Sequence, residues 1–174
     1  MDNAGKRIWH ADTIGRVYGI LDEMLYSLAV YREISPLIKN DGAYDPYLRR
    51  FWTSVSNNSL QMAAIHWCKV FGAERNNKTY YAHFVSPVRF KDNLKGISFE
   101  DISDQMRYFR DKFAVHEDND SKPIPLFNNA VKVVEAFDET VRDEYDVFDL
   151  PAVKETFEAY QLQIQDCLQE CRIE

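Results

Sequence analysis

Arg110 and His116, in the stretch YFRDKFAVHEDND at residues 108–120, are the residues whose types and spacing best suit chemistry. An imidazole titrates near neutral pH, so it can take up or release a proton. A guanidinium can hold a phosphate, or the extra negative charge of a five-coordinate phosphorus. Asp111 follows Arg110 and can orient one of the two through a charge-assisted hydrogen bond. This set suits RNA cleavage without a metal ion, in which the 2′-hydroxyl of the substrate attacks the adjacent phosphate.

The pair needs a break in the helix to act together. Positions six apart on a straight α-helix are rotated by roughly 240°, so Arg110 and His116 would point to different faces. The polar run that begins at Glu117 is typical of sequences that end helices. We therefore predict that the helix stops near residues 113–115, which would free His116 to turn back toward Arg110.

Helical periodicity runs through most of the rest of the chain. Asp12 or Thr13 can cap a first helix that ends before Pro36. Its predicted core stripe is Ile14, Val17, Leu21, Leu25 and Leu28. Asp45 and Pro46 predict the start of a second helix, and Gly72 stands at its expected C′ position. The stripe expected for that helix is Leu48, Trp52, Val55, Met62 and Val70.

Residues 74–97 contain turn formers, a proline and an aromatic patch, so we expect an irregular insertion there, either extended or with one helical turn. Ser98 and Asp101 resemble a capping box before a third helix. The apolar positions of the third helix are Phe99, Ile102, Met106, Phe109 and Phe113. Those of the fourth are Ala130, Val131, Val134, Phe137 and Val141. A fifth helix is started by Asp149 and Pro151 and shows Val153, Phe157, Tyr160, Ile164, Cys167, Leu168 and Cys171.

These elements predict an all-α fold, an up-and-down bundle of about five helices in a single domain over residues 1–174. The sequence contains no apolar run long enough to span a bilayer and no secretory leader pattern, so we expect a cytoplasmic protein that does not contact membranes. Three cysteines are too few to form a disulfide framework, which favours reduced thiols.

Charge is distributed unevenly along the chain. The net charge of −7 argues against sequence-blind adhesion to nucleic acid. Residues 1–95 carry 13 Lys and Arg against 9 Asp and Glu (net +4), whereas residues 96–174 carry 8 against 19 (net −11). A polyanion would therefore approach the first half, together with Arg107, Arg110 and Lys112. His83, in the aromatic and basic stretch around KTYYAHF, is a further candidate for contact with RNA bases or backbone, although the rings there can equally cover the bundle.

Other polar residues are better explained by structure. His66, beside Trp67, is more typical of a core histidine than of a catalyst, although it would line the same cleft if the second and third helices pack together. Cys68, Cys167 and Cys171 lack zinc-finger spacing, so we expect buried thiols and neither a metal nor another cofactor. The acidic positions of the fourth helix (Glu135, Asp138, Glu139, Asp143 and Glu144) have no Glu-x-x-His partner for a di-iron site and are expected to be solvated, with Asp138 and Arg142 as a local pair.

Arg110, Asp111 and His116 at a helix end in an all-helical chain resemble the motif of the HEPN superfamily, an arginine and a histidine separated by four to six residues. The two-part pattern of HWCKVFG at 66–72 and FRDKFAVHED at 109–118 looks like the U-type abortive-infection branch of that superfamily. The resemblance spans roughly residues 10–165.

This resemblance implies a homodimer in which motifs from two protomers form a composite ribonuclease site, in a phage-defence or toxin–antitoxin system with a possible neutralising partner protein. Arg110 and His116 would be the catalytic residues, and Asp111 the polar position between them. The alternative is a non-catalytic HEPN-like module that binds RNA, a nucleotide or a partner protein.

Overall fold

The fold is all-α, as the sequence predicts. The structure is a computed structural model that describes residues 11–39, 46–73, 76–113, 125, 127–145 and 151–170. Five long helices are α1 (Ala11–Lys39), α2 (Pro46–Phe71), α4 (Phe99–Phe113), α5 (Phe127–Glu144) and α6 (Val153–Glu170). A 3-10 turn, η1 (Tyr81–His83), and a short helix, α3 (Pro87–Asn93), lie between α2 and α4. None of the helices described is long and apolar enough to cross a membrane.

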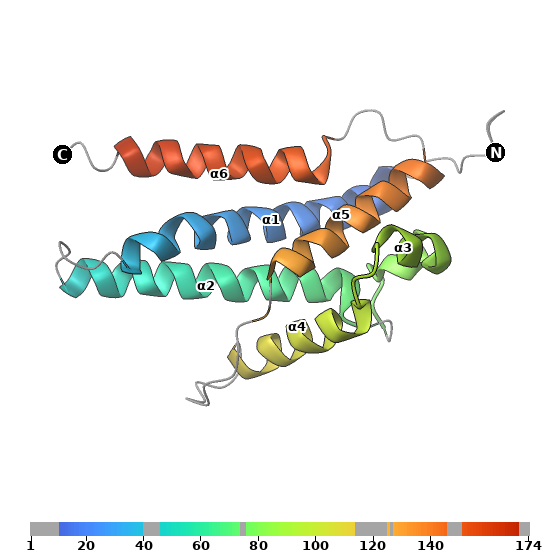
Figure 1. Cartoon of the computed structure of the whole chain (residues 1–174), viewed down its shortest axis with the longest axis horizontal. Coiled ribbons are helices and arrows are strands. Elements are labelled where there is room, and N and C mark those ends of the chain that lie inside the picture. The colour runs from blue at the N-terminus through green and yellow to red at the C-terminus, as the bar shows by residue number, and fades with distance from the viewer. Residues whose placement is uncertain are drawn as a thin grey trace.

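The long helices alternate in direction along the chain (Figure 1). α1 and α2 form an antiparallel hairpin, with α6 against the other side of α1. α4 packs on α2, and α5 crosses the hairpin obliquely. One apolar core joins them; its largest fully buried side chains are Trp67, Phe71, Phe90 and Phe137. The predicted up-and-down bundle is therefore confirmed.

The predicted stripes of α1, α4 and α5 lie in the core. Every described member is less than a tenth exposed, from Ile14 in α1 to Val141 in α5. The serine half of the predicted capping box is also present, because Ser98 Oγ accepts a hydrogen bond from the Asp101 backbone N–H (3.3 Å). In each case the apolar residues recur every three or four positions on one face, so periodicity alone identifies the buried side.

Two predicted boundaries of α1 were wrong. The helix begins at Ala11, ahead of Asp12 and Thr13, and it continues through Pro36 to Lys39. Proline removes one backbone hydrogen bond, the one to the carbonyl of residue 32. The loss falls in the last turn of a long helix that packs along α2, so this packing outweighs it.

The predicted core stripe of α2 was mostly wrong, because Val70 is the one member of it that is buried. Leu48 is exposed (51%), as is Met62 (42%). The buried side is instead formed by Ser56, Leu60, Ala63, Ala64, His66, Trp67, Cys68, Val70 and Phe71. α2 carries apolar residues on more than one side, so its periodicity did not separate the core face from the solvent face. The start at Pro46 is confirmed, and Gly72 donates its backbone N–H to the Cys68 carbonyl (3.0 Å).

The segment at 74–97 is more regular than predicted, which raises the number of α-helices described from five to six. Pro87 stands at the start of α3, where its fixed φ favours a helix. Phe90 is fully buried, with its ring centroid 4.5 Å from that of Tyr81 and 5.4 Å from that of Phe99. Lys95 (φ 51°) and Gly96 (φ 89°) then turn the chain into α4. These contacts join α3 to other elements of the fold, so the local sequence carried little signal for this helix.

Candidate functional site

Arg110 lies in the last turn of α4, at the end that points toward the N-terminal half of α2 (Figure 1). α4 runs antiparallel to α2, since Ser103 Oγ donates to the Phe71 carbonyl (3.5 Å) while Arg110 lies beside Cys68. The Arg110 side chain is 36% exposed. The part of the Arg110 side chain nearest the backbone is therefore held by the α2–α4 contact, and its guanidinium reaches solvent.

Asp111 holds this guanidinium. Arg110 Nε donates to Asp111 Oδ1 at 2.8 Å, and a terminal nitrogen of Arg110 lies 2.6 Å from the same oxygen. Partial burial lowers the pKa of Arg110, but the hydrogen bond and charge of Asp111 outweigh it, so the pKa is above its ordinary value. Asp111 thus orients one member of the predicted pair, and Arg110 stays positively charged.

His116 lies outside the described residues, as does everything from 114 to 124. Phe113 is the last residue of α4 that the structure describes, so the predicted end of the helix near residues 113–115 stays a prediction. The spatial relation between Arg110 and His116 therefore stays a prediction.

The other predicted RNA-contacting residues are divided between the two ends of α4. Arg107 and Lys112 share the Arg110 end, where Arg107 is ion-paired with Asp104 one turn earlier. His83 lies at the opposite end, in η1: its neighbour Tyr81 has its ring centroid 5.2 Å from that of Phe99. Three turns of α4, roughly 16 Å, separate Phe99 from Arg110. Arg107, Arg110 and Asp111 all act on the pKa of Cys68 and so lie together, whereas Lys112 shares only the end of α4, since it is rotated by about 200° from Arg110 around the helix axis. His83 lies apart from all of them.

Cys68 and His66 point in different directions from α2. Burial raises the pKa of Cys68 to about 11, although the nearby guanidiniums of Arg110 and Arg107 act in the opposite direction, so the thiol is protonated at neutral pH. His66 is 9% exposed and faces the Glu23 backbone of α1. The core interpretation of His66 is confirmed, and its ring does not face Arg110.

The predicted burial of Cys167 was wrong, because this residue is exposed in α6, at the edge of the stripe formed by Val153, Phe157 and Ile164. Cys171 lies outside the described residues. Among the described residues, no group of three or more His, Cys, Asp or Glu side chains is arranged to hold a metal ion.

A buried polar network that sequence reasoning missed joins α1, α5 and α6. Asp138, expected on a solvated face, is only 5% exposed. Its Oδ1 accepts from the Tyr18 hydroxyl (2.6 Å), and its Oδ2 accepts from Arg142 Nε (3.0 Å) and the Val153 backbone N–H (3.3 Å). Burial and the Asp138 charge raise the pKa of Tyr18, so its hydroxyl stays a donor. The predicted pair of Asp138 and Arg142 was the one sequence signal for this network.

Glu144 was also misjudged as solvated. It is 7% exposed, and its Oε1 accepts from the Ser86 backbone N–H (3.0 Å). Nearby, the Tyr145 hydroxyl donates to the Phe84 carbonyl (2.7 Å) and Asn93 Nδ2 donates to Thr140 Oγ1 (3.0 Å). Each of these bonds attaches the η1–α3 segment to α5, so the segment is fixed by side chains distant in sequence.

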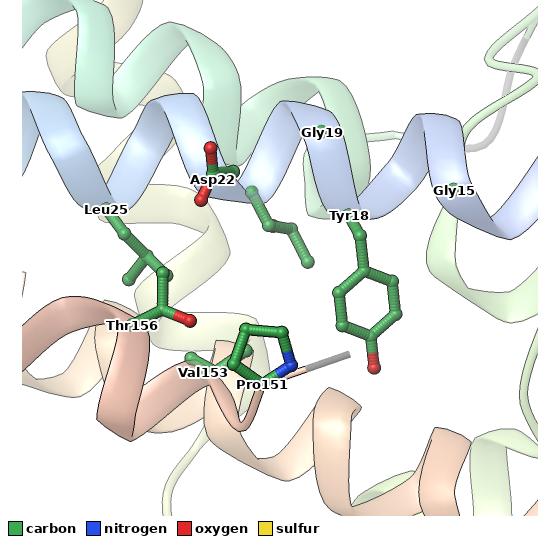
Figure 2. A pocket seen from close by; sticks show the side chains of 9 residues that line it. Gly15, Tyr18, Gly19, Asp22, Leu25, Pro151, Val153 and Thr156 are labelled. Atoms are coloured by element: carbon green, nitrogen blue, oxygen red, sulfur yellow. The ribbon is translucent and has the colours of Figure 1, made fainter. Parts of the chain in front are cut away.

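A pocket of about 230 Å³ lies beside Tyr18, between α1 and the start of α6 (Figure 2). Its lining residues are Gly15, Tyr18, Gly19, Leu21, Asp22, Leu25, Pro151, Val153 and Thr156. No lysine, arginine or histidine lines it, so it does not suit a phosphate. α1 separates this pocket from α2 and α4, which makes it distinct from the region of Arg110 (Figure 1).

Comparison of the chain with protein-family models, with curated proteins and with solved structures finds no match.

Proposed function

We propose that this protein is an endoribonuclease that acts without a metal ion, with Arg110 and His116 as its catalytic residues. The observation that supports the proposal is the placement of Arg110: it is held by Asp111 in the last turn of α4 and partly exposed, six positions before His116. A charged, oriented and accessible guanidinium next to an imidazole is the minimum set that phosphodiester cleavage requires.

In the proposed reaction, the 2′-hydroxyl of the RNA attacks the adjacent phosphorus while His116 removes its proton. The P–O bond to the 5′ oxygen of the next nucleotide breaks, and that oxygen takes up a proton from water while His116 returns its proton to solvent. The products are a 2′,3′-cyclic phosphate and a 5′-hydroxyl end. Arg110 stabilises the negative charge that builds on the non-bridging oxygens, while Asp111 positions Arg110.

We also propose that two protomers act together in the cytoplasm, as the HEPN resemblance implies, within a phage-defence or toxin–antitoxin system. In a homodimer, an Arg110 and a His116 from each chain would face one substrate. A neutralising partner protein would then cover this cleft.

The test is incubation of purified protein with single-stranded RNA in the presence of a chelator. We expect wild-type cleavage, a loss of at least 100-fold in Arg110→Ala and His116→Ala, and full activity in Arg89→Ala, an exposed arginine on α3. A matched DNA strand should resist, because it lacks the 2′-hydroxyl. Equal cleavage by all the variants would refute the assignment.

A non-catalytic RNA-binding module is the second candidate, and the ion pair between Arg110 and Asp111 is the observation that favours it. A guanidinium already paired with a carboxylate carries less net charge to offer a transition state. Wild-type protein that shifts RNA on a gel and leaves it intact would support this second function.

A further inference from the structure

The helix α2 differs from its neighbours in charge. It contains no aspartate or glutamate, whereas each of the other four long helices carries several. Its charged residues are Arg49, Arg50 and Lys69. In a protein of net charge −7, a helix of 26 residues without a carboxylate is a local surface to which a polyanion can bind.

Exposed aromatic rings accompany this charge. Tyr47 is 85% exposed and Phe51 is 56% exposed, one helical turn apart. Arg49 and Arg50 lie between them and are also exposed. Base stacking on exposed rings, together with nearby guanidiniums that hold phosphates, is the common chemistry of single-stranded nucleic acid binding.

One side of α2 connects these residues to Arg110. At 100° per residue, Arg50, Ser54, Asn57 and Gln61 lie within roughly 60° of Cys68 around the helix axis. Cys68 is the residue against which Arg110 lies. We call the side formed by Arg50, Ser54, Asn57 and Gln61, together with the rings of Tyr47 and Phe51 at its edge (about 60° and 100° around the axis from Cys68), the outer face of α2.

The outer face is open where α4 ends. Arg50, Ser54 and Asn57 are exposed, and Gln61 is half-buried. Because α4 runs antiparallel to α2, its C-terminal turn, which contains Arg110, points toward the N-terminal half of α2 (Figure 1). Asp111 stands at the junction, and its charge is offset by Arg110.

We infer that the outer face of α2 is the track along which a single-stranded RNA reaches Arg110. The inference depends on the proposed function, to which it adds the form of the substrate. Residues 50–68 span about 27 Å of helix, enough for about eight nucleotides at the stacked spacing of about 3.4 Å. Tyr47 and Phe51 stack unpaired bases, and Arg50 holds a phosphate. The side chains of Ser54, Asn57 and Gln61, between Phe51 and Cys68, contact sugars and base edges. A duplex, whose bases are already stacked on each other, gains little from these rings.

The experiment measures binding separately from cleavage. The probe is a fluorescein-labelled single-stranded RNA dodecamer with 2′-O-methyl groups, which carries no nucleophile, titrated with the full chain and followed by anisotropy. Arg50→Ala and Phe51→Ala are the test variants. Arg89→Ala on α3 and Leu162→Ala on α6 replace residues of the same kind that are exposed elsewhere. All four side chains are exposed, and circular dichroism checks that each variant is folded.

We expect Arg50→Ala and Phe51→Ala each to raise Kd at least fivefold, with both control variants within twofold of wild type. Arg50→Ala should also reduce the slope of log K against log salt concentration by about 0.7, as the loss of one phosphate contact to a single strand predicts. Shortening the probe below about eight nucleotides should weaken binding, and a duplex of the same sequence should bind more weakly than the single strand.

Unchanged Kd values for Arg50→Ala and Phe51→Ala would overturn the track, as would equal affinity for the duplex. A shift from dimer to monomer in Phe51→Ala with unchanged RNA affinity would also overturn it, because the face would then be a contact between two copies of the chain. Cleavage reports on the proposed function separately. If the wild type cleaves RNA and the track variants bind normally, the track alone is wrong. If RNA stays intact but binding depends on Arg50 and Phe51, catalysis alone is wrong.

Discussion

The two sides of α1 use polar side chains in opposite ways. On the α5–α6 side, Asp138 is buried and accepts three hydrogen bonds from three different elements. On the α2–α4 side, Arg110 and Asp111 pair with each other while both remain partly exposed. A buried charge must be fully satisfied if the fold is to be stable, whereas a group that meets a ligand must keep part of its surface accessible. This comparison assigns a structural role to the first set and leaves the second available for function.

Asp138→Ala should lower the stability of the fold more than any other substitution considered for the two sides of α1. It leaves the Tyr18 hydroxyl, the Arg142 guanidinium and the Val153 N–H without their acceptor, so we expect the free energy of unfolding to fall by about 3–5 kcal/mol. Urea denaturation measures this. Asp143→Ala, an exposed carboxylate on the same helix, is the control and should change stability by less than about 0.5 kcal/mol. A loss as small as that of the control would mean that the network is not structural.

Tyr18→Phe should lower the free energy of unfolding by less than Asp138→Ala does. The change keeps the ring, which packs 6.3 Å from the Phe137 ring, and removes only the donor to Asp138 Oδ1. A hydrogen bond to a charged acceptor is worth about 1.5–3 kcal/mol, so unfolding should require correspondingly less denaturant. Tyr26→Phe, in the same helix but exposed, is the matched control. RNA cleavage per folded molecule should be unaffected by either change.

His66 should make stability depend on pH by a smaller amount. Burial, helped by the Lys69 charge and opposed by Glu23, lowers the pKa of His66 below its ordinary 6.5. The unfolded chain therefore binds a proton at a higher pH than the folded chain does, and the stability present above pH 6.5 is lost as the pH falls below it. Between pH 7.5 and 5.5, His66→Gln should flatten this decline relative to wild type.

Substitutions on the outer face of α2 should have the smallest effect on stability. Tyr47→Ser and Phe51→Ser remove rings that are largely in solvent, so each should change the free energy of unfolding by less than about 0.5 kcal/mol. Thermal unfolding followed by circular dichroism measures this. A large loss at Phe51 would indicate that the ring supports the fold, for example through Trp52, whose ring centroid lies 5.0 Å away.

The sequence predicted those features that depend on local periodicity and capping. α4 is the clearest example, since Ser98 caps it and Met106 and Phe109 are buried as expected. Features that depend on distant partners could not be read in this way. Phe90 packs on rings from three other segments, and Asp138 is buried because Tyr18, which is 120 positions away in the chain, reaches it.

The candidate site shows the same division. The pairing of Arg110 with Asp111 follows from adjacent residues and is present in the structure. The predicted end of α4 borders residues 114–124, which lie outside the described residues, so it stays a prediction. In α2, Leu48, Val55 and Met62 have the spacing of a core stripe, yet none of them is buried. Hydrophobic spacing cannot distinguish a helix face covered by a neighbour from one that is left exposed.

α6 buries fewer apolar side chains than the other long helices do. Only Val153, Phe157 and Ile164 are buried along it, and much of its contact with α1 is made by polar pairs such as Tyr160 with Asp22 and Gln161 with Glu33. Elements that bury little apolar surface detach before the whole domain unfolds. Its amide hydrogens should therefore exchange with solvent sooner than those of α2, and the chain can lose its outermost helix for short periods while the α2–α4 pair that carries Arg110 stays folded.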